Sequence, residues 1–276
     1  KRLIADVPIG IFLSGGVDSS MIAQYAKRHA PDIHAFSVAY KNYTEADESR
    51  YANAVSRTLD MPCHFGYFED ALVKEKFLNI LDYMDEPMAD IAIVPLYYIA
   101  EEARKEITVV LSGDGGDEIF GGYLKYKAQS LIEKYRYFGF LADRVKNFFP
   151  KGGSYFKLAN SFHLDFSARQ FIFGSGSLLP DEVKELLFSK VDVGEIFSEA
   201  ERYVKIFRQK DVINKSLFLD CKIQLPDWYL VKGDRATMAN SLEMRNPLLD
   251  KTLAEYMFSV GGEWKIRNGE QKFILK

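Results

Sequence analysis

Apolar runs and helical patterns alternate along the first 125 residues of the chain. Short apolar or β-branched runs that favour strands cover Val7–Leu13, His34–Ala39, Cys63–Phe68 and Thr108–Leu111. Segments with helical spacing lie between them, at Ser19–His29, Glu48–Leu59, Asp70–Asp82 and Pro95–Lys105. Because such alternation is typical of βαβ units, it predicts an α/β fold in which helices cover both faces of a parallel sheet.

The pattern changes after residue 125. Aromatic residues recur at a spacing typical of a packed core, as in Tyr135–Phe138, and Leu179–Glu182 reads as the capped start of a helix. We therefore expect two regions. The first is an α/β core over residues 1–125, and the second is a mostly helical extension over residues 126–276 that packs against the sheet.

A loop rich in glycine and serine, Leu13–Ser20, joins the first expected strand to the first helix. Its glycines let a ligand approach the backbone, its hydroxyls donate hydrogen bonds, and the start of the helix offers free N–H groups to an anion. Asp18 would repel a phosphate there unless a cation such as Mg²⁺ lay between them. The pattern lacks the lysine of a Walker A loop, and an ordinary Gly/Ser turn is the alternative interpretation.

A second loop of this kind, Ser112–Glu118, follows the strand that ends at Leu111. Both loops lie at carboxyl ends of expected strands, which is where ligands bind in parallel sheets. Asp114, Asp117 and Glu118 concentrate negative charge, which favours a metal or a cationic group nearby. A calcium loop would need a different spacing of acidic residues, and an acidic turn that caps a helix near Glu118 is the alternative.

Composition excludes several classes of protein. The 276 residues are 47% hydrophobic and 27% charged, with a formal net charge of −3, so neither nucleic acid nor an anionic membrane is an expected partner. No apolar run approaches the roughly 20 residues of a membrane span. The two cysteines, Cys63 and Cys221, lie far apart without metal-ligand spacing. We expect buried thiols in the cytoplasm.

The first loop resembles the S-G-G-x-D-S signature of the PP-loop ATP pyrophosphatases, which split ATP between its α and β phosphates. Further motifs in the same order are similar to those of the asparagine synthetase family: Asp85–Glu86–Pro87, Ser112–Tyr123, Leu225–Asp227, Asp234–Ala239, Glu243–Asp250 and Gly269–Lys276. The resemblance runs from about Val7 to the last residue. It implies an adenine nucleotide alpha hydrolase-like fold with ATP and Mg²⁺ as cofactors.

The resemblance also implies roles for individual residues. Lys272, on an expected helix, would reach the phosphates and the adenylate, although an ordinary surface lysine is the alternative. Glu86 would be the general base, with Asp85 or Asp90 as substitutes. Asp18 and Asp117 would hold Mg²⁺, and Asp234 and Arg235 would bind the substrate or the phosphates, with a structural ion pair as an equal competitor. The residues expected around the nucleotide are Leu13, Ser14, Gly15, Gly16, Asp18, Ser19, Val38, Ser112, Gly113 and Asp114.

These roles describe a ligase that adenylates a carboxylate, releases pyrophosphate and transfers ammonia to form an amide. The aspartate side chain is the expected acceptor, and a sugar acid or another carboxylate is the alternative. Two other classes of protein are alternatives. One is a PP-loop enzyme that modifies tRNA, for which the sequence lacks a basic face or a cysteine pair, and the other is a non-catalytic nucleotide-binding module.

The resemblance covers only the synthetase half of such enzymes. Nothing in the chain matches the glutamine-hydrolysing half, and Cys63 is poorly placed to be its nucleophile. We therefore expect an excised domain of a longer protein, supplied with ammonia by an N-terminal glutaminase domain or by solvent, and a homodimer is one option for its assembly. Gly233 and Asn246 depart from the branched apolar residues usual in the family, which indicates a repacked core or a different acceptor pocket.

Overall fold

The structure is a computed structural model that describes residues 1–40, 47–86, 88–145, 148–150, 153–174, 182, 195 and 197–276. Pro87 and, apart from Glu182, the helix start expected at Leu179–Glu182 lie outside the described residues. No helix in the described ranges is both long enough and apolar enough to cross a lipid bilayer.

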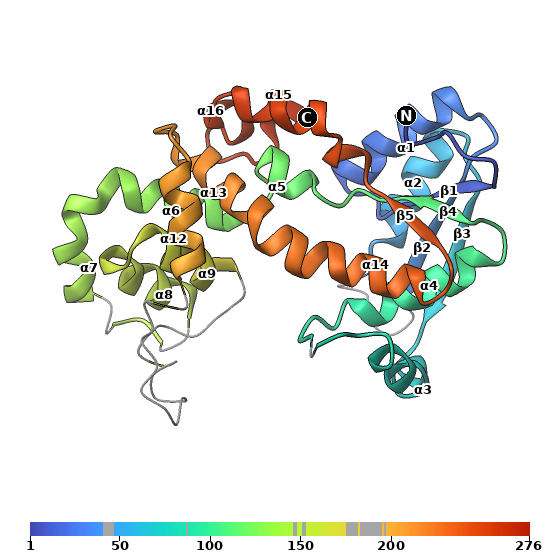
Figure 1. Cartoon of the computed structure of the whole chain (residues 1–276), viewed down its shortest axis with the longest axis horizontal. Helices are drawn as coiled ribbons and strands as arrows, with labels where there is room; N and C mark the ends of the chain where they lie inside the picture. The colour runs from blue at the N-terminus through green and yellow to red at the C-terminus, as the bar shows by residue number, and fades with distance from the viewer. Residues whose placement is uncertain are drawn as a thin grey trace. The chain divides into compact units, whose positions relative to one another are not determined.

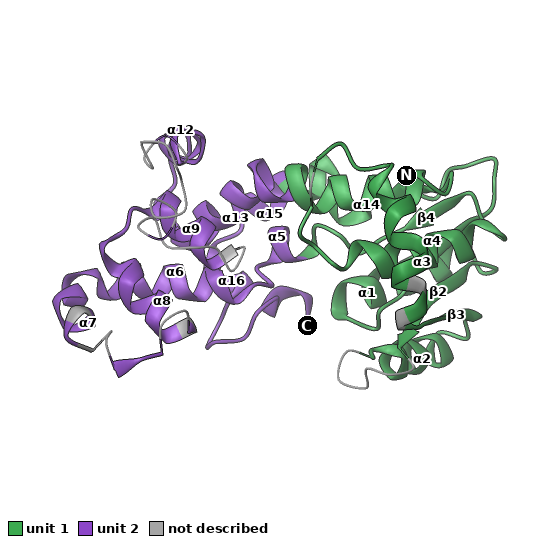
Figure 2. Cartoon of the chain, turned by 90° about the horizontal axis from the view of Figure 1, so that it is seen from below, with its two compact units in different colours: residues 1–116, 226–254 green, residues 117–225, 255–276 purple. Residues whose placement is uncertain are grey.

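The chain folds into two compact units, which Figure 2 colours separately. Unit 1 contains residues 1–116 and 226–254, and unit 2 contains residues 117–225 and 255–276. The sequence pattern grouped residues 126–276 as one extension. In the structure, residues 226–254 instead fold with the sheet.

Unit 1 is built on a five-stranded parallel sheet with the strand order β3-β2-β1-β4-β5. The strands are β1 (Ile9–Phe12), β2 (His34–Tyr40), β3 (Cys63–Phe68), β4 (Val109–Leu111) and β5 (Glu243–Arg245). The first four confirm the predicted strands within a few residues. β5 was not predicted; it pairs with β4, with Val110 opposite Met244.

Helices cover both faces of this sheet, as predicted (Figure 1). The helices of unit 1 are α1 (Val17–His29), α2 (Ser49–Thr58), α3 (Asp70–Leu81), α4 (Ile93–Arg104) and α14 (Val231–Met238), with a short 3₁₀ turn η5 (Pro247–Leu249). Side chains alternate between the faces of a strand. Phe36 and Val110 accordingly pack with Ile99 of α4 in one apolar cluster, while Ile11 is fully buried on the opposite face.

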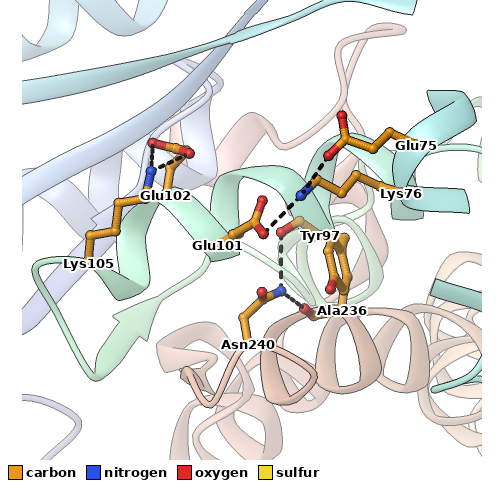
Figure 3. Close-up of polar contacts among 8 residues, drawn as sticks. All are labelled: Glu75, Lys76, Tyr97, Glu101, Glu102, Lys105, Ala236 and Asn240. Atoms are coloured by element: carbon orange, nitrogen blue, oxygen red, sulfur yellow. Dashed lines mark hydrogen bonds and ion pairs between the residues drawn. The ribbon is translucent and has the colours of Figure 1, made fainter. Parts of the chain in front are cut away.

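Polar contacts hold α4 to its neighbours α3 and α14 (Figure 3). The Lys76 ammonium lies 3.0 Å from the Glu101 carboxylate. The side-chain amide of Asn240, just after α14, donates to the backbone carbonyl of Tyr97 at 3.3 Å. Ala236 of α14 and Tyr97 also share a buried apolar cluster. These contacts fix α14, which carries three charged residues of the candidate site, against the helix layer on the sheet.

Unit 2 is helical. Its elements are α6 (Leu124–Tyr135), η1 (Arg136–Phe138), α7 (Gly139–Val145), α8 (Ser154–Asn160), η3 (Ser161–His163), α9 (Phe166–Gly174), α12 (Ser198–Ile206), α13 (Val212–Lys222), α16 (Gly262–Lys265) and η6 (Phe273–Leu275). The division between the units falls within three further elements, α5 (Gly116–Phe120), the π-helical η4 (Leu225–Leu230) and α15 (Lys251–Ser259).

A buried polar network joins α6, α9 and α13 in the core of unit 2. The Asp220 carboxylate accepts hydrogen bonds from the Tyr126 hydroxyl and the Gln170 amide, both at 2.6 Å. The Lys125 ammonium lies 2.7 Å from the same carboxylate, and both side chains are 3% exposed. Because an unpaired buried charge is strongly destabilising, these partners specify how the three helices pack.

A second buried lysine belongs to α16 and contacts the first turn of α13. Lys265 of α16 is fully buried, and its ammonium donates to the Asn214 side-chain carbonyl at 2.6 Å. Asp211 caps α13 by accepting from the Asn214 N–H at 3.0 Å and also accepts from the Gly262 N–H at 2.6 Å. Burial lowers the pKa of Lys265 to about 8, although the charge of Asp211 opposes that shift.

The expected helix at Gly269–Lys276 is wrong. Asn268 and Gly269 both have positive φ, +50° and +79°, and form a two-residue turn in which Arg267 and Glu270 exchange backbone hydrogen bonds of 3.0 and 2.8 Å. Lys272 also has a left-handed φ of +52°, and only the single 3₁₀ turn η6 follows. The two left-handed residues inside the expected range, Gly269 and Lys272, are incompatible with a continuous right-handed helix.

Candidate active site

The loop after β1 makes a sharp turn that only glycine accommodates. The Leu13 N–H donates to the Phe36 carbonyl at 2.9 Å, so strand pairing continues to the edge of the loop. Gly15 has a φ of +82°, and a Cβ there would lie 2.4 Å from the Tyr51 carbonyl carbon of α2. The turn therefore packs directly against α2, and Gly16 follows as the N-cap of α1.

The hydroxyls of this loop bond to one another and to the backbone. The Ser14 and Ser19 hydroxyl oxygens are 3.0 Å apart. The Ser14 hydroxyl accepts from the Gly16 N–H at 3.2 Å, while the Ser19 hydroxyl donates to the Gly16 carbonyl at 3.2 Å. These contacts hold both side chains at the start of α1, where the backbone N–H groups and the helix dipole favour an anion.

The loop after β4 packs against the first loop, as the topology predicted. A Cβ on Gly116 would lie 2.4 Å from the carboxyl carbon of Asp18, and one on Gly113 would lie 3.1 Å from the Ser19 nitrogen. Asp18, Ser19 and Ser112 are each less than 10% exposed. Unit 1 thus brings together the predicted residues Leu13, Ser14, Gly15, Gly16, Asp18, Ser19, Ser112 and Gly113.

Two further residues are predicted to contact the nucleotide. The Asp114 N–H donates to the Ser112 hydroxyl at 3.4 Å, which places Asp114 in the same turn. Val38 is a half-buried residue of β2 that packs against both apolar clusters under α4. Its predicted contact with adenine stays a prediction.

The two aspartates predicted to hold Mg²⁺ fall in different units. Asp18 is in unit 1, whereas Asp117 is the first residue of unit 2. Within unit 2, the Asp117 carboxylate lies 2.8 Å from the Lys272 ammonium, with side-chain exposures of 32% and 16%. Carboxylate oxygens are the hard ligands that Mg²⁺ prefers, so each aspartate by itself is a suitable ligand type. Their joint use as ligands stays a prediction.

Glu118, at the end of the second loop, is a deeply buried carboxylate. It is 2% exposed, and the Tyr123 hydroxyl donates to it at 2.9 Å. Burial raises the pKa of Glu118 to about 7, against the effect of this hydrogen bond. From the sequence, Glu118 is predicted only as part of an acidic turn. The sequence pattern does not show which of the turn's three carboxylates is buried.

Two salt bridges connect the segment at Asp85–Asp90 to α14. The Arg235 guanidinium donates to the Asp85 carboxylate from Nε at 2.9 Å and also from Nη2. The Lys232 ammonium donates to the Asp90 carboxylate at 2.6 Å, and both side chains are less than 20% exposed. Burial of Asp90 would raise the pKa of that carboxyl, but the hydrogen bond and charge of Lys232 hold it below its usual value. Sequence reasoning missed Lys232, since its partner is distant in the chain.

These pairs bear on the choice of general base. Asp85 and Asp90, the two substitutes for Glu86, each have a cationic partner on α14, whereas Glu86 is exposed and takes part in neither pair. A carboxylate oxygen that already accepts from a cation is not free to receive a proton from ammonia. The arrangement therefore favours Glu86 among the three, and its catalytic role stays a prediction.

Asp234 and Arg235 form an ion pair with each other, at 3.1 Å, in addition to the pair with Asp85. Asp234 and Arg235 therefore form the structural ion pair that was the alternative interpretation of these residues. Their predicted contact with substrate stays untested.

The departures from the family pattern have a packing cause at Gly233. A Cβ there would lie 2.2 Å from the terminal methyl group of Met244, so the methionine fills the space of a larger side chain.

Arg245 has an architectural position, since it donates to the carbonyls of Arg2 and Ile4 at 3.0 and 2.9 Å. Both cysteines are free and half-buried, and burial raises the pKa of the Cys63 thiol to about 11.

Comparison with known proteins gives a consistent family. A family model described as asparagine synthase matches residues 1–276. A glutamine-hydrolysing asparagine synthetase of Bacillus subtilis (strain 168) is 30% identical over 283 residues, which is 99% of this chain and 43% of the relative. A Mycobacterium tuberculosis (strain H37Rv) protein, provisionally named a glutamine-hydrolysing asparagine synthetase, is 32% identical over 291 residues, covering 100% of this chain and 43% of the relative. The chain thus spans less than half the length of these relatives.

Proposed function

The chain belongs to the asparagine synthase family, and on that premise we propose that it is the synthetase part of an ATP-dependent amide-forming ligase. In this proposal, the aspartate side chain is adenylated with release of pyrophosphate, and ammonia then displaces AMP to give asparagine. The observation that supports this most directly is the packing of the two glycine-rich loops, with Gly116 against the Asp18 carboxylate at the carboxyl ends of β1 and β4.

The loop after β1 would bind the leaving pyrophosphate. The Ser14 and Ser19 hydroxyls and the backbone N–H groups from Gly15 onward would exchange their mutual hydrogen bonds for bonds to phosphate oxygens. Leu13 and Val38 would contact adenine, and Ser112, Gly113 and Asp114 would line the rest of the nucleotide. Magnesium held by Asp18 and Asp117 would neutralise charge on the phosphates.

Lys272 would stabilise the charge that develops on the phosphates and on the adenylate. Its ammonium is paired with the Asp117 carboxylate within unit 2. Asp234 and Arg235 would bind the amino-acid substrate or the phosphates, in exchange for their present ion pairs. These interactions lower the barrier only if they are stronger in the transition state than with bound ATP.

Glu86 would accept a proton from ammonia as the nitrogen attacks the acyl carbon. The salt bridges from α14 to Asp85 and Asp90 hold the segment on either side of it. Ammonia would come from a glutaminase domain of a longer protein or from solvent. A cytoplasmic location and a homodimeric assembly remain part of the proposal.

The test is an assay of pyrophosphate release. The chain, and a longer protein that contains it, are incubated with magnesium ATP and ¹⁵N-ammonium, with aspartate added, omitted or replaced by glutamate, which is one methylene longer. We expect release that requires aspartate and yields ¹⁵N-labelled asparagine in equal amount.

Other results would change the proposal in defined ways. Pyrophosphate release that requires a different carboxylate would keep the amide-forming chemistry and replace the acceptor. A folded longer protein that does not bind ATP would contradict the proposal as a whole.

A further inference from the structure

Two histidines and a glutamate meet at the end of the sheet opposite the glycine-rich loops. His34 is the first residue of β2, His64 is the second residue of β3, and Glu106 lies in the turn between α4 and β4. All strands are parallel, so these positions gather at the amino ends of the strands. The loops after β1 and β4 lie at the carboxyl ends, and the cluster is therefore separate from the candidate active site.

The register of the sheet places both imidazoles on one face. Phe36 lies opposite His64 in the β2–β3 ladder, and His34 is two residues before Phe36. Residues two apart share a face of a strand, so the side chains of His34, Phe36 and His64 all project toward α4. The His64 ring stacks on Phe36 with centroids 5.0 Å apart, and on His34 at 5.1 Å.

The three side chains present converging donor atoms. His64 Nε2 is 3.1 Å from His34 Nδ1. Glu106 Oε1 is 3.2 Å from His64 Nδ1, and Glu106 Oε2 is 3.8 Å from His34 Nδ1. One donor atom from each residue lies within 4.8 Å of the other two. Ligands on a common tetrahedral zinc are separated by roughly 3.3 Å, since each nitrogen lies about 2.0–2.1 Å from the metal. Small side-chain rotations would therefore bring the three donor atoms to the separations found around a bound zinc ion.

The cluster also has room for a solvent ligand. The side chains of His34, His64 and Glu106 are 41%, 40% and 44% exposed. Cys63 is not part of the ligand set, because it alternates with His64 and projects from the other face of the sheet.

We propose that His34, His64 and Glu106 form a site for a divalent transition metal, with Zn²⁺ as the best fit and water in the fourth position. Two imidazole nitrogens and one carboxylate are a ligand set of zinc sites with an open position. Mg²⁺ prefers oxygen ligands in octahedral geometry, so this site would select against the ion proposed for the phosphates. A chain of hydrogen bonds, from His34 to His64 to Glu106, is the alternative that involves no metal.

The experiment is a titration of the purified chain with Zn²⁺ in the presence of excess Mg²⁺, followed by calorimetry. Co²⁺ is used in parallel, because its visible absorption reports a four-coordinate nitrogen and oxygen environment. We expect one equivalent of metal per chain. His34→Gln and His64→Gln should each weaken binding by more than about tenfold, and Glu106→Gln by about tenfold.

Two controls make the result specific. His29→Gln changes an exposed histidine outside the cluster and should leave affinity unchanged. Asp18→Asn should also retain zinc binding, so the site can fail or succeed independently of the proposed ligase function. Thermal unfolding of each variant establishes that it is folded.

The proposal is overturned if the wild-type chain binds no Zn²⁺ and develops no Co²⁺ absorption. It is equally overturned if folded His34→Gln and His64→Gln variants bind as tightly as the wild type. Should a histidine variant fail to fold, Glu106→Gln and the Co²⁺ spectrum of the wild type decide the question.

Discussion

The ammonium of Lys272 lies 2.8 Å from the carboxylate of Asp117. In the proposed mechanism, Asp117 binds magnesium and Lys272 binds the phosphates, so the two groups neutralise each other before either ligand arrives. Binding of magnesium ATP would exchange one ion pair for two contacts with the nucleotide complex. In this proposal, the pair would hold both side chains in place until magnesium ATP binds.

Lys272→Met should abolish pyrophosphate release and, in the absence of ATP, should strengthen Mg²⁺ binding, because Asp117 loses its competing cation. Kinetics and magnesium titration measure the two effects. Lys276→Met is the matched control, since Lys276 pairs with the exposed Glu270 at 3.2 Å. Equal activity of the Lys272 and Lys276 variants would contradict the assignment.

Asp18→Asn should eliminate magnesium-dependent turnover and leave the fold intact. The substitution keeps the shape that packs against Gly116 and removes the charge that would hold the metal. Activity and thermal unfolding are measured together, with Asp82→Asn, an exposed position after α3, as the control. Full activity in the Asp18 variant would show that magnesium is held elsewhere.

Gly15→Ala should destabilise unit 1 by about 2–4 kcal/mol, since a Cβ would meet the backbone of α2 at a left-handed φ. Gly16→Ala is the neighbouring control: its φ is −67° and its Cβ would meet only the Ser14 hydroxyl, at 3.3 Å. It should cost less than about 1 kcal/mol. Urea unfolding compares the two, and equal losses would mean that the turn relaxes away from α2.

Glu86→Gln should slow amide formation more than adenylate formation, because only the second step needs a proton acceptor. The two half-reactions are followed as pyrophosphate release and amide yield in single turnover. Asp85→Asn, which weakens the pair with Arg235, should affect both steps alike. The same uniform loss in the Glu86 variant would make Glu86 a binding or structural residue.

Lys265→Met should flatten the dependence of unfolding free energy on pH above pH 8. The folded protein binds a proton at Lys265 up to about pH 8, and the unfolded chain up to about 10.5. Because the unfolded state holds more protons in that interval, wild-type stability rises with pH there, by about 3 kcal/mol in total. Unfolding at several pH values gives the slope. An unchanged slope in the variant would assign the effect to another group.

The sequence predicted the sheet well where strands are buried, because buried parallel strands are apolar runs bounded by turns. β5 was not predicted, because Glu243–Met244–Arg245 is a three-residue edge strand with two charged side chains. The expected helix at Gly269–Lys276 failed for a different reason. Asn268–Gly269 forms a two-residue turn typical of hairpins, whereas the expected helix rested on the family resemblance.

For the candidate site, loop residues could be predicted because strand topology alone sends both glycine-rich loops to one edge of the sheet. The partners of Asp85 and Asp90 could not be predicted from the sequence, because α14, which contributes Arg235 and Lys232, lies far along the chain. The His34–His64–Glu106 cluster was likewise invisible, because it depends on the exact register of β2 and β3.

The discontinuity of unit 1 has a consequence for biosynthesis. A ribosome releases the chain from its amino end, so β4 remains an open edge until residues 226–254 emerge with β5 and α14. A nascent chain that stopped before residue 226 would carry both glycine-rich loops but neither cation that restrains the Asp85–Asp90 segment. Assembly of unit 1 therefore waits for the translation of residues 226–254, and its contacts of long sequence separation slow folding.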